Sequence, residues 1–287
     1  MNRFPEFMQF SIEDHINDGV DWLWTTFEGF FDAIKTGVLW LLMQLEGFLL
    51  WLPWWLIIAL IIGLGWRATG RLRFGLILGA LMLFIGCLGL WDRAMQTLAL
   101  VAGAVFISLV LGIPVGIWMA WNRTVEGCIK PVLDAMQTMP SFVYLIPALM
   151  FFGLGKVPAL FATIIYAIPP VIRLTNLGIR QVPDDVVEAG RAFGSTNMQI
   201  LFKIQIQLAM PSIMSGVNQT TMMALAMVVL ASMIGAQGLG EPVLISLQQI
   251  NVGRGFEAGL SIVILAIIID RILQGFGQKR QPADWSA

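Results

Sequence analysis

Long stretches without a charged side chain are the feature that most limits what this chain can fold into. Only 12% of the 287 residues are charged, and most of them bound apolar stretches. A helix that crosses a bilayer needs about 20 consecutive, mostly apolar residues. Seven stretches meet this need, over residues 46–67, 73–92, 93–123, 134–156, 156–173, 203–241 and 256–275. The sequence therefore predicts an all-α, polytopic membrane protein with about seven transmembrane helices.

The lysines and arginines between these stretches give the arrangement a direction. Twelve of them fall on one side of the predicted membrane and five on the other. The cytoplasmic side of a membrane protein carries the excess of lysine and arginine. We therefore expect residues 178–207 and the C-terminus in the cytoplasm, the N-terminus outside, and residues 235–255 as an external loop.

The first 46 residues differ from the rest, because they hold eight of the 18 acidic residues. Their apolar side chains recur at the spacing of one helix face, at Ile16, Val20, Leu23, Phe27, Phe30, Ile34 and Val38. This pattern predicts an amphipathic helix on the outer membrane surface or against the spans. The alternative, an eighth span over 36–51, would place Glu46 inside the membrane. The expected division is an external segment 1–46, a membrane domain 47–276 and a cytoplasmic tail 277–287.

A polar stretch, DDVVEAGRAFGSTNMQILFKIQ at 184–205, interrupts the apolar chain. Pro183 and the two aspartates after it suit the first turn of a helix, and Gly194 suits a left-handed stop. Thr196 and Gln199 have the spacing of a capping box that starts a second helix. The stretch therefore predicts two short helices at an angle, joined at Gly194, with the next span beginning near Pro211. Such an element is either a docking site for a cytoplasmic partner or an ordinary loop with interfacial helices.

The segments EAGRAFG at 188–194 and IQIQLAMPSIMSG at 204–216 resemble the EAA signature of permease subunits in binding-protein-dependent ABC importers. Segments 134–183, 228–240 and 255–272 resemble the glycine betaine/proline betaine permeases of that family, and the resemblance covers roughly residues 20–275. It implies the type I ABC importer permease fold, with the signature helices inserted into a groove of the ATP-binding subunit.

Carried onto this sequence, the resemblance makes the polar stretch the coupling element. The candidate coupling residues are Asp185, Glu188, Ala189, Gly190, Arg191, Gly194 and Ser195. Two positions depart from the family pattern: Gly190 replaces a second alanine, and Gln207 replaces a usual proline. We expect Gly190 to let a partner backbone approach closely, and Gln207 to let the second helix continue unbroken.

The chain offers no chemistry of its own to drive transport. It contains no GxxxxGK[ST] motif, so ATP and Mg are expected on a partner ATPase, and no cofactor is expected in this chain. One histidine and two cysteines make a metal site or a catalytic site improbable, and a net charge of −1 speaks against nucleic acid as a partner. An ion-coupled secondary transporter is the alternative function, and the lack of a mid-span carboxylate disfavours it.

Polar residues within the spans are the candidates for a substrate pathway, and we select Gln137, Ser141, Asn218, Thr221 and Met222. The competing interpretation is structural, because polar groups in hydrocarbon often bond a neighbouring helix and methionines often fill gaps in packing. Prolines at 140, 147, 169 and 170 interrupt two spans, and broken helices line cavities in many transporters.

The resemblance also implies an assembly and a cargo. The assembly would be a homodimer of this chain in a bacterial inner membrane, with two cytoplasmic ATP-binding subunits and an external substrate-binding protein. The cargo would be a quaternary ammonium or related methylated amine, such as glycine betaine, proline betaine, choline, carnitine or trimethylamine N-oxide. The residues do not choose among these solutes, because selection is expected to lie on the binding protein.

Overall fold

The computed structural model describes residues 13–278, and the described part of the chain is helical throughout, without strands. The prediction of an all-α fold is therefore confirmed. The helices in chain order are α1 (Glu13–Thr26), α2 (Glu28–Trp51), α3 (Trp54–Thr69), α4 (Leu72–Cys87), α5 (Trp91–Trp121), α6 (Arg123–Thr138), η2 (Ser141–Tyr144), α7 (Leu145–Phe152), α8 (Lys156–Ala167), α9 (Pro169–Arg180), α10 (Asp184–Ala192), α11 (Asn197–Ile200), η3 (Leu201–Gln205), α12 (Ile206–Ala226), α13 (Val228–Ser232), α14 (Gly240–Gln248) and α15 (Val252–Gln278).

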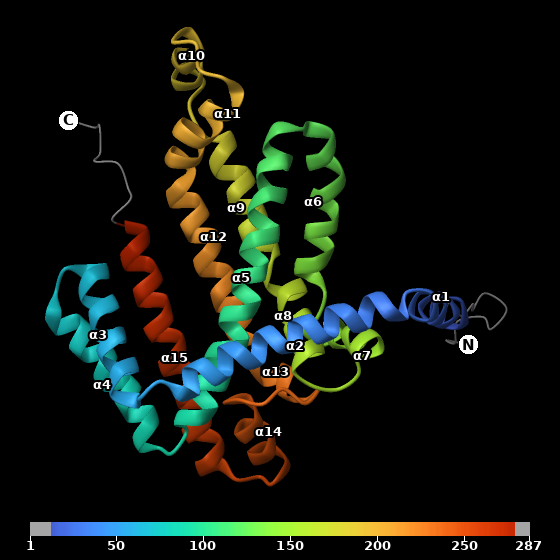
Figure 1. Cartoon of the computed structure of the whole chain (residues 1–287), viewed down its shortest axis with the longest axis vertical. Helices are drawn as coiled ribbons and strands as arrows, with labels where there is room; N and C mark the ends of the chain where they lie inside the picture. The colour runs from blue at the N-terminus through green and yellow to red at the C-terminus, as the bar shows by residue number, and fades with distance from the viewer. Residues whose placement is uncertain (1–12, 279–287) are drawn as a thin grey trace, which may run out of the picture.

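Helices α5, α9, α12 and α15 form the centre of the molecule (Figure 1). Small residues let their backbones approach closely, as is usual where helices meet in a membrane. A Cβ atom added to Gly178 of α9 would lie 2.7 Å from the Cβ of Ser212 on α12, and one added to Gly116 of α5 would lie 2.7 Å from the Ile172 carbonyl of α9. These contacts fix α9 between α5 and α12.

Within residues 13–278, four helical stretches are long and apolar enough to cross a membrane. They are α2, α5, the continuous helix 156–180 and the continuous helix 197–232. The pair formed by α6 and η2–α7 qualifies only if it is counted as one bent span, and α3 and α4 are apolar helices of 16 residues each. The described part of the chain is thus that of a multi-pass membrane protein.

Two of the seven predicted spans are broken at a proline. The stretch 46–67 is not one helix: α2 ends at Trp51, Pro53 is extended (φ −57°, ψ 137°), and α3 begins at Trp54. The stretch 134–156 is likewise broken, because Met139 and Pro140 are extended and the chain bends by 112° between α6 and η2. In both places a proline disfavours helical geometry in the residue before it and cannot donate a backbone hydrogen bond.

Several connections lie at two opposite ends of the molecule (Figure 1). Helices α10 and α11, the α5–α6 turn and the end of α15 lie at one end, which we call the elbow end. The α7–α8 turn and α14 lie at the other, the far end. That the elbow end faces the cytoplasm stays a prediction. The C-terminal residues 279–287 of the predicted tail, and residues 1–12, lie outside the described part of the chain.

The N-terminal segment is helical as predicted, but in two pieces. Helix α1 ends at Thr26, and α2 begins at Glu28 after a break at Phe27 and continues past residue 46 to Trp51. Figure 1 shows α2 lying across the bundle, at a large angle to α5, α12 and α15. Leu42 is the one residue of α2 that is fully buried. The contact of α2 with the rest of the fold is therefore limited to one narrow stripe.

Candidate functional site

The polar stretch forms a protruding element at the elbow end, which we call the elbow (residues 182–200). Pro183 is the extended residue before α10, and Asp184 and Asp185 occupy the first turn as predicted. Gly194 has the predicted left-handed conformation (φ 78°). The amide of Ser195 donates to the Gly190 carbonyl at 3.1 Å, which closes the end of α10.

The predicted capping box starts the second helix. The Gln199 amide donates to the Thr196 hydroxyl at 3.3 Å, and the Thr196 amide donates to the Gln199 side chain at 2.9 Å. The expectation of a second short helix is wrong, because the helix continues from Asn197 to Ser232 with Pro211 inside it. One π-helical turn, η3, absorbs a change of register at 201–205. The expectation that Gln207 permits an unbroken helix is confirmed.

The elbow is fastened to the membrane part of the chain by a small apolar cluster. Val182, Val187 and Ile200 are buried and pack with Ile204 of η3. Gly190 is also buried, and a Cβ atom added there would lie 2.7 Å from the Ile204 Cδ1. The expectation that Gly190 receives a partner backbone is therefore wrong: the missing side chain makes room for the chain's own isoleucine.

The other candidate coupling residues lie on the outside of the elbow. Asp185, Glu188, Ala189, Arg191 and Gly194 are exposed, and Ser195 is half-buried. With them lies an apolar surface that the residue pattern did not single out. Phe193 is 92% exposed, and Val186 and Met198 are also exposed. These exposed apolar side chains on a polar protrusion are the candidate contacts for a partner protein. The signal in the sequence was the phenylalanine inside EAGRAFG.

Below the elbow, Arg180 joins three helices. Its guanidinium lies 2.8 Å from the Glu126 carboxylate of α6 and donates to the Met119 carbonyl of α5 at 2.9 Å. It also donates to the Asn176 side chain on its own helix at 3.0 Å, and Asn176 donates to Glu126 at 3.2 Å. Helix α9 leads directly into the elbow. Through Arg180, a movement of the elbow would therefore be passed to α5 and α6. Sequence reasoning treated Arg180 only as a positive charge.

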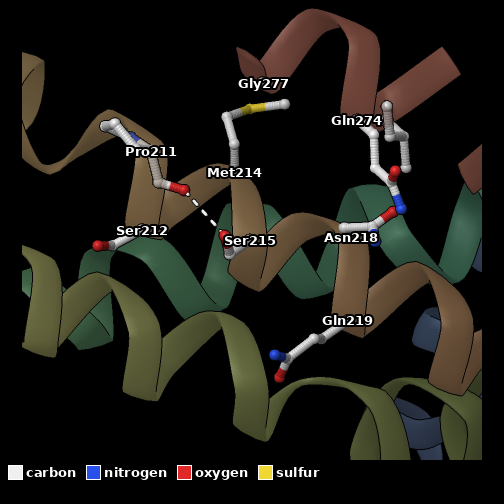
Figure 2. A pocket seen from close by; sticks show the side chains of 9 residues that line it. Pro211, Ser212, Met214, Ser215, Asn218, Gln219, Gln274 and Gly277 are labelled. Atoms are coloured by element: carbon white, nitrogen blue, oxygen red, sulfur yellow. Dashed lines mark hydrogen bonds between the residues drawn. The ribbon is translucent and has the colours of Figure 1, made fainter. Parts of the chain in front are cut away.

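The candidate pathway residues separate into two grooves on either side of α12. Gln137 is exposed and lines a groove of about 470 Å³ between α6, α9 and α12, together with Arg173 and Gln219. Arg173 lies inside the helix 156–180 and pairs with Asp134 of α6 rather than standing in a connection. Asn218 lines a second groove of about 450 Å³, together with Gln219, Ser215 and Gln274 (Figure 2).

The remaining pathway candidates lie in neither groove. The Thr221 side chain is buried and donates to the Val217 carbonyl of its own helix at 2.8 Å. Met222 packs against the largest apolar cluster, which supports the packing interpretation of this residue. Ser141 begins η2, directly after the bend at Pro140. Thus Gln137 and Asn218 each line a groove, whereas Ser141, Thr221 and Met222 do not line these two.

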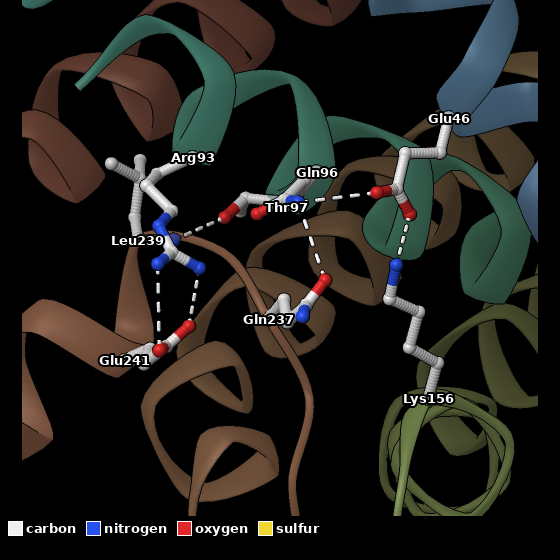
Figure 3. Close-up of polar contacts among 8 residues, drawn as sticks. All are labelled: Glu46, Arg93, Gln96, Thr97, Lys156, Gln237, Leu239 and Glu241. Atoms are coloured by element: carbon white, nitrogen blue, oxygen red, sulfur yellow. Dashed lines mark hydrogen bonds and ion pairs between the residues drawn. The ribbon is translucent and has the colours of Figure 1, made fainter.

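A polar network closes the far end (Figure 3). Glu46 of α2 pairs with Lys156 at the start of α8 (2.5 Å) and accepts from Gln96 of α5 at 3.1 Å. Beside it, Arg93 of α5 pairs with Glu241 of α14. Glu46 is therefore paired at this end, which answers the objection that an apolar helix through residue 46 would bury an isolated charge. The network joins the N-terminal helix to the predicted external loop.

Comparison with known proteins identifies the architecture. Residues 112–281 match the family model described as binding-protein-dependent transport system inner membrane component. The chain is 46% identical over 283 residues to the glycine betaine transport system permease protein OpuAB of Bacillus subtilis, with 98% of each chain covered. It is 45% identical over 267 residues to the glycine betaine/proline betaine transport system permease protein ProW of Escherichia coli, covering 93% of this chain and 75% of that protein.

A solved structure shares the fold. The permease arrangement in inward-facing MetNI, a methionine ABC transporter, aligns with a TM-score of 0.61 at 21% sequence identity and covers 70% of this chain and 98% of that one. The predicted type I importer permease fold is thereby confirmed. With the match over residues 112–281 and the near full-length relatives, the chain belongs to the family of binding-protein-dependent transport system inner membrane components.

Proposed function

We propose that this chain is the membrane-spanning subunit of an ATP-driven importer for a quaternary ammonium or related methylated-amine osmolyte. Two copies would form the pathway between them in a bacterial inner membrane, with the elbow in the cytoplasm and the N-terminus outside. Two ATPase subunits, which bind ATP and Mg, would dock on the elbows, and a substrate-binding protein would dock on the far end. The relatives named above, permeases for glycine betaine and proline betaine, support this cargo class.

The observation that carries the proposal is the exposure of the elbow. Glu188 and Arg191 of α10 are exposed, and so is Phe193, whose side chain is 92% exposed. Helix α10 lies at the tip of a protrusion from the bundle (Figure 1). A phenylalanine in water costs about 1.5–3 kcal/mol relative to a buried one. A second protein that covers Phe193 recovers this free energy. The apolar cluster around Ile204 then transmits movement of the elbow into the continuous helix 197–232.

The fold suggests how such movement reaches the pathway. Helix α9 ends at the elbow, and its last residue, Arg180, contacts α5 and α6. Rotation of the elbow would therefore move α6 together with α9 and α12, three of the helices that line the Gln137 groove. Rigid helices that move as units between two packed arrangements are the usual means of alternating access.

The test is uptake by the reconstituted complex. Proteoliposomes that contain this chain, its ATPase and its binding protein should accumulate glycine betaine only when ATP and binding protein are both supplied. A proton uncoupler should leave the initial rate unchanged while the ATP concentration is held constant. Uptake by this chain alone, driven by an ion gradient, would establish the secondary-transporter function instead.

A further inference from the structure

Asp270 is a carboxylate within α15 that follows a run of apolar residues, 262–269. Its side chain is only 20% exposed. Its ion pair with Arg271 is at the limit of distance, with Arg271 Nε 4.0 Å from Asp270 Oδ2. The Arg271 side chain lines a different groove, beside Arg71 and Thr69. Asp270 lies near the end of the predicted span 256–275, and a carboxylate beside so apolar a run is a candidate functional residue.

Two neutral amides hold this carboxylate. Asn218 of α12 donates to Asp270 Oδ1 at 2.9 Å, and Gln274, one turn along α15, donates to both carboxylate oxygens at 2.7 and 2.8 Å. These hydrogen bonds fix the position of the carboxylate without neutralising its charge. The Asn218 Oδ1 atom is buried and has no hydrogen-bond donor. Because the Asn218 and Gln274 amides donate to Asp270, the carboxylate keeps its negative charge, and Asn218 Oδ1 has no donor.

The same amides line a groove large enough for a small solute. Asn218 and Gln274 face the groove of about 450 Å³ between α12 and α15, whose other lining residues are Pro211, Ser212, Met214, Ser215, Gln219, Leu273 and Gly277 (Figure 2). None of these lining residues is charged. Asp270, which Asn218 and Gln274 contact directly, therefore contributes negative potential to the groove.

We propose that this groove is a transit site for the positively charged nitrogen of the cargo, with Asp270 as the residue that attracts it. The inference rests on the proposed function and adds a position in this chain. A quaternary ammonium group offers no N–H donor, so the field of a nearby carboxylate suits it better than a directional hydrogen bond. The groove has no aromatic cage to strengthen the cation contact. Weak attraction is appropriate in a pathway, because a solute must also leave.

The test measures the electrostatic potential of the groove by the reactivity of a thiol placed in it. In the assembled complex with Cys87 and Cys128 replaced by serine, the variant Ser215→Cys places a thiol in the groove, where Ser215 is exposed. Its reaction rates are compared for two methanethiosulfonates, one with a trimethylammonium group and one with a sulfonate group. We expect the cationic reagent to react faster, and Asp270→Asn to lower the cation-to-anion rate ratio about tenfold, because the carboxylate charge is lost.

A matched thiol gives the control. Thr124→Cys, exposed at the start of α6 and away from the groove, should show the same rate ratio with and without Asp270→Asn. An unchanged ratio at residue 215, or no reaction of the Ser215→Cys variant with either reagent, would overturn the proposal. This measurement needs no transport, so its failure is distinct from a failure of the proposed function.

Transport then separates a charge role from a packing role. Asp270→Asn should reduce glycine betaine uptake about tenfold while the ATPase activity stimulated by the binding protein persists, and Asp270→Glu should recover part of the uptake. Equal loss of assembly in both variants would show that Asp270 only joins α12 to α15. Uptake by Asp270→Asn at the rate of the unmodified chain would equally contradict the proposal.

Discussion

The ammonium of Lys156 lies 2.5 Å from the carboxylate of Glu46, so a residue of the N-terminal helix α2 is bound to the start of α8, 110 residues later. Both side chains are mostly buried, at 23% and 14% exposed. This pair, with Gln96, is the main polar attachment of a helix that otherwise contributes one buried residue to the fold. This charge pair therefore adds to apolar contacts of α2, such as the stacking of Phe31 on Phe151, that hold the helix across the bundle.

Glu46→Ala should release α2 and leave the Lys156 ammonium without its partner. Removing one member of a partly buried pair costs about 1–3 kcal/mol, because the remaining charge stays desolvated. We expect a lower midpoint of thermal unfolding for the purified chain and faster proteolysis between α2 and α3. The exchanged double variant Glu46→Lys, Lys156→Glu should regain most of the loss. Equal stability of the Ala variant and the unmodified chain would contradict this account.

Glu188→Lys should abolish association with the ATPase while the chain still inserts into the membrane. The residue is exposed on α10, so the substitution reverses a charge on the docking surface without disturbing the packing below it. Co-purification of the two subunits measures the effect. Asp18→Lys, an equal charge reversal on the exposed helix α1, is the control and should co-purify normally. Normal yield of ATPase with Glu188→Lys would count against the elbow as the docking site.

Phe193→Ala should weaken the same association by about 2 kcal/mol or more, because large aromatic side chains dominate interface energetics when they are covered. Quantitative binding of the ATPase to the detergent-solubilised chain measures the change. The comparison is Phe106→Ala, which removes a ring that is 63% exposed on the side of α5 rather than on the elbow. Phe106→Ala should bind the ATPase as the unmodified chain does. Similar binding by both variants would show that Phe193 remains uncovered.

Gly75→Ala should separate α3 from α4, because a Cβ atom there would lie 2.4 Å from the Ile62 carbonyl oxygen. Overpacking against backbone costs about 1–3 kcal/mol, since a carbonyl cannot rotate away as a side chain can. Gly63→Ala is the matched control, because a Cβ at residue 63 meets nothing within 4 Å. We expect Gly75→Ala to lower the unfolding midpoint and Gly63→Ala to leave it unchanged or slightly higher. A lower unfolding midpoint for Gly63→Ala than for Gly75→Ala would contradict the close packing of α3 on α4.

Thiol labelling tests the predicted orientation. In a background without Cys87 and Cys128, a cysteine in place of Thr25 on α1 should react with a membrane-impermeant reagent in intact spheroplasts. A cysteine in place of Ser195 on the elbow should react only after the membrane is opened. Labelling of Ser195→Cys from outside would reverse the orientation and remove the elbow from any cytoplasmic ATPase.

The sequence predicted local features of the elbow with good accuracy, because each follows from the chemistry of one or two residues. The left-handed Gly194, the Thr196–Gln199 capping box and the acidic first turn of α10 all occur as predicted. The role of Gly190 was predicted wrongly because it depends on a neighbour in the fold rather than on local chemistry. Its helix propensity gives no information on which neighbour needs the space, and only the fold shows that Ile204 occupies it.

For the spans, too, the sequence predicted local character but not tertiary context. Runs of uncharged residues show where apolar helices occur, but not where a proline breaks one. Pro140 produces a bend of 112°, whereas Pro211 lies inside a continuous helix. The two prolines differ in tertiary context: α12 is packed along α9 and α15, which holds it straight, whereas α6 and η2 form a bend at the edge of the bundle.

The sequence by itself determined that this chain is a helical membrane protein with a polar, glycine-hinged element between two spans. Charge and hydropathy are properties of each residue, so they can be read from the sequence without knowledge of tertiary contacts. Only the tertiary structure decided which polar residues meet: Asn218 with Asp270, Arg180 with Glu126, and Lys156 with Glu46. Those pairs join helices that are distant in sequence, and their meeting depends on how the packed bundle aligns the faces of those helices.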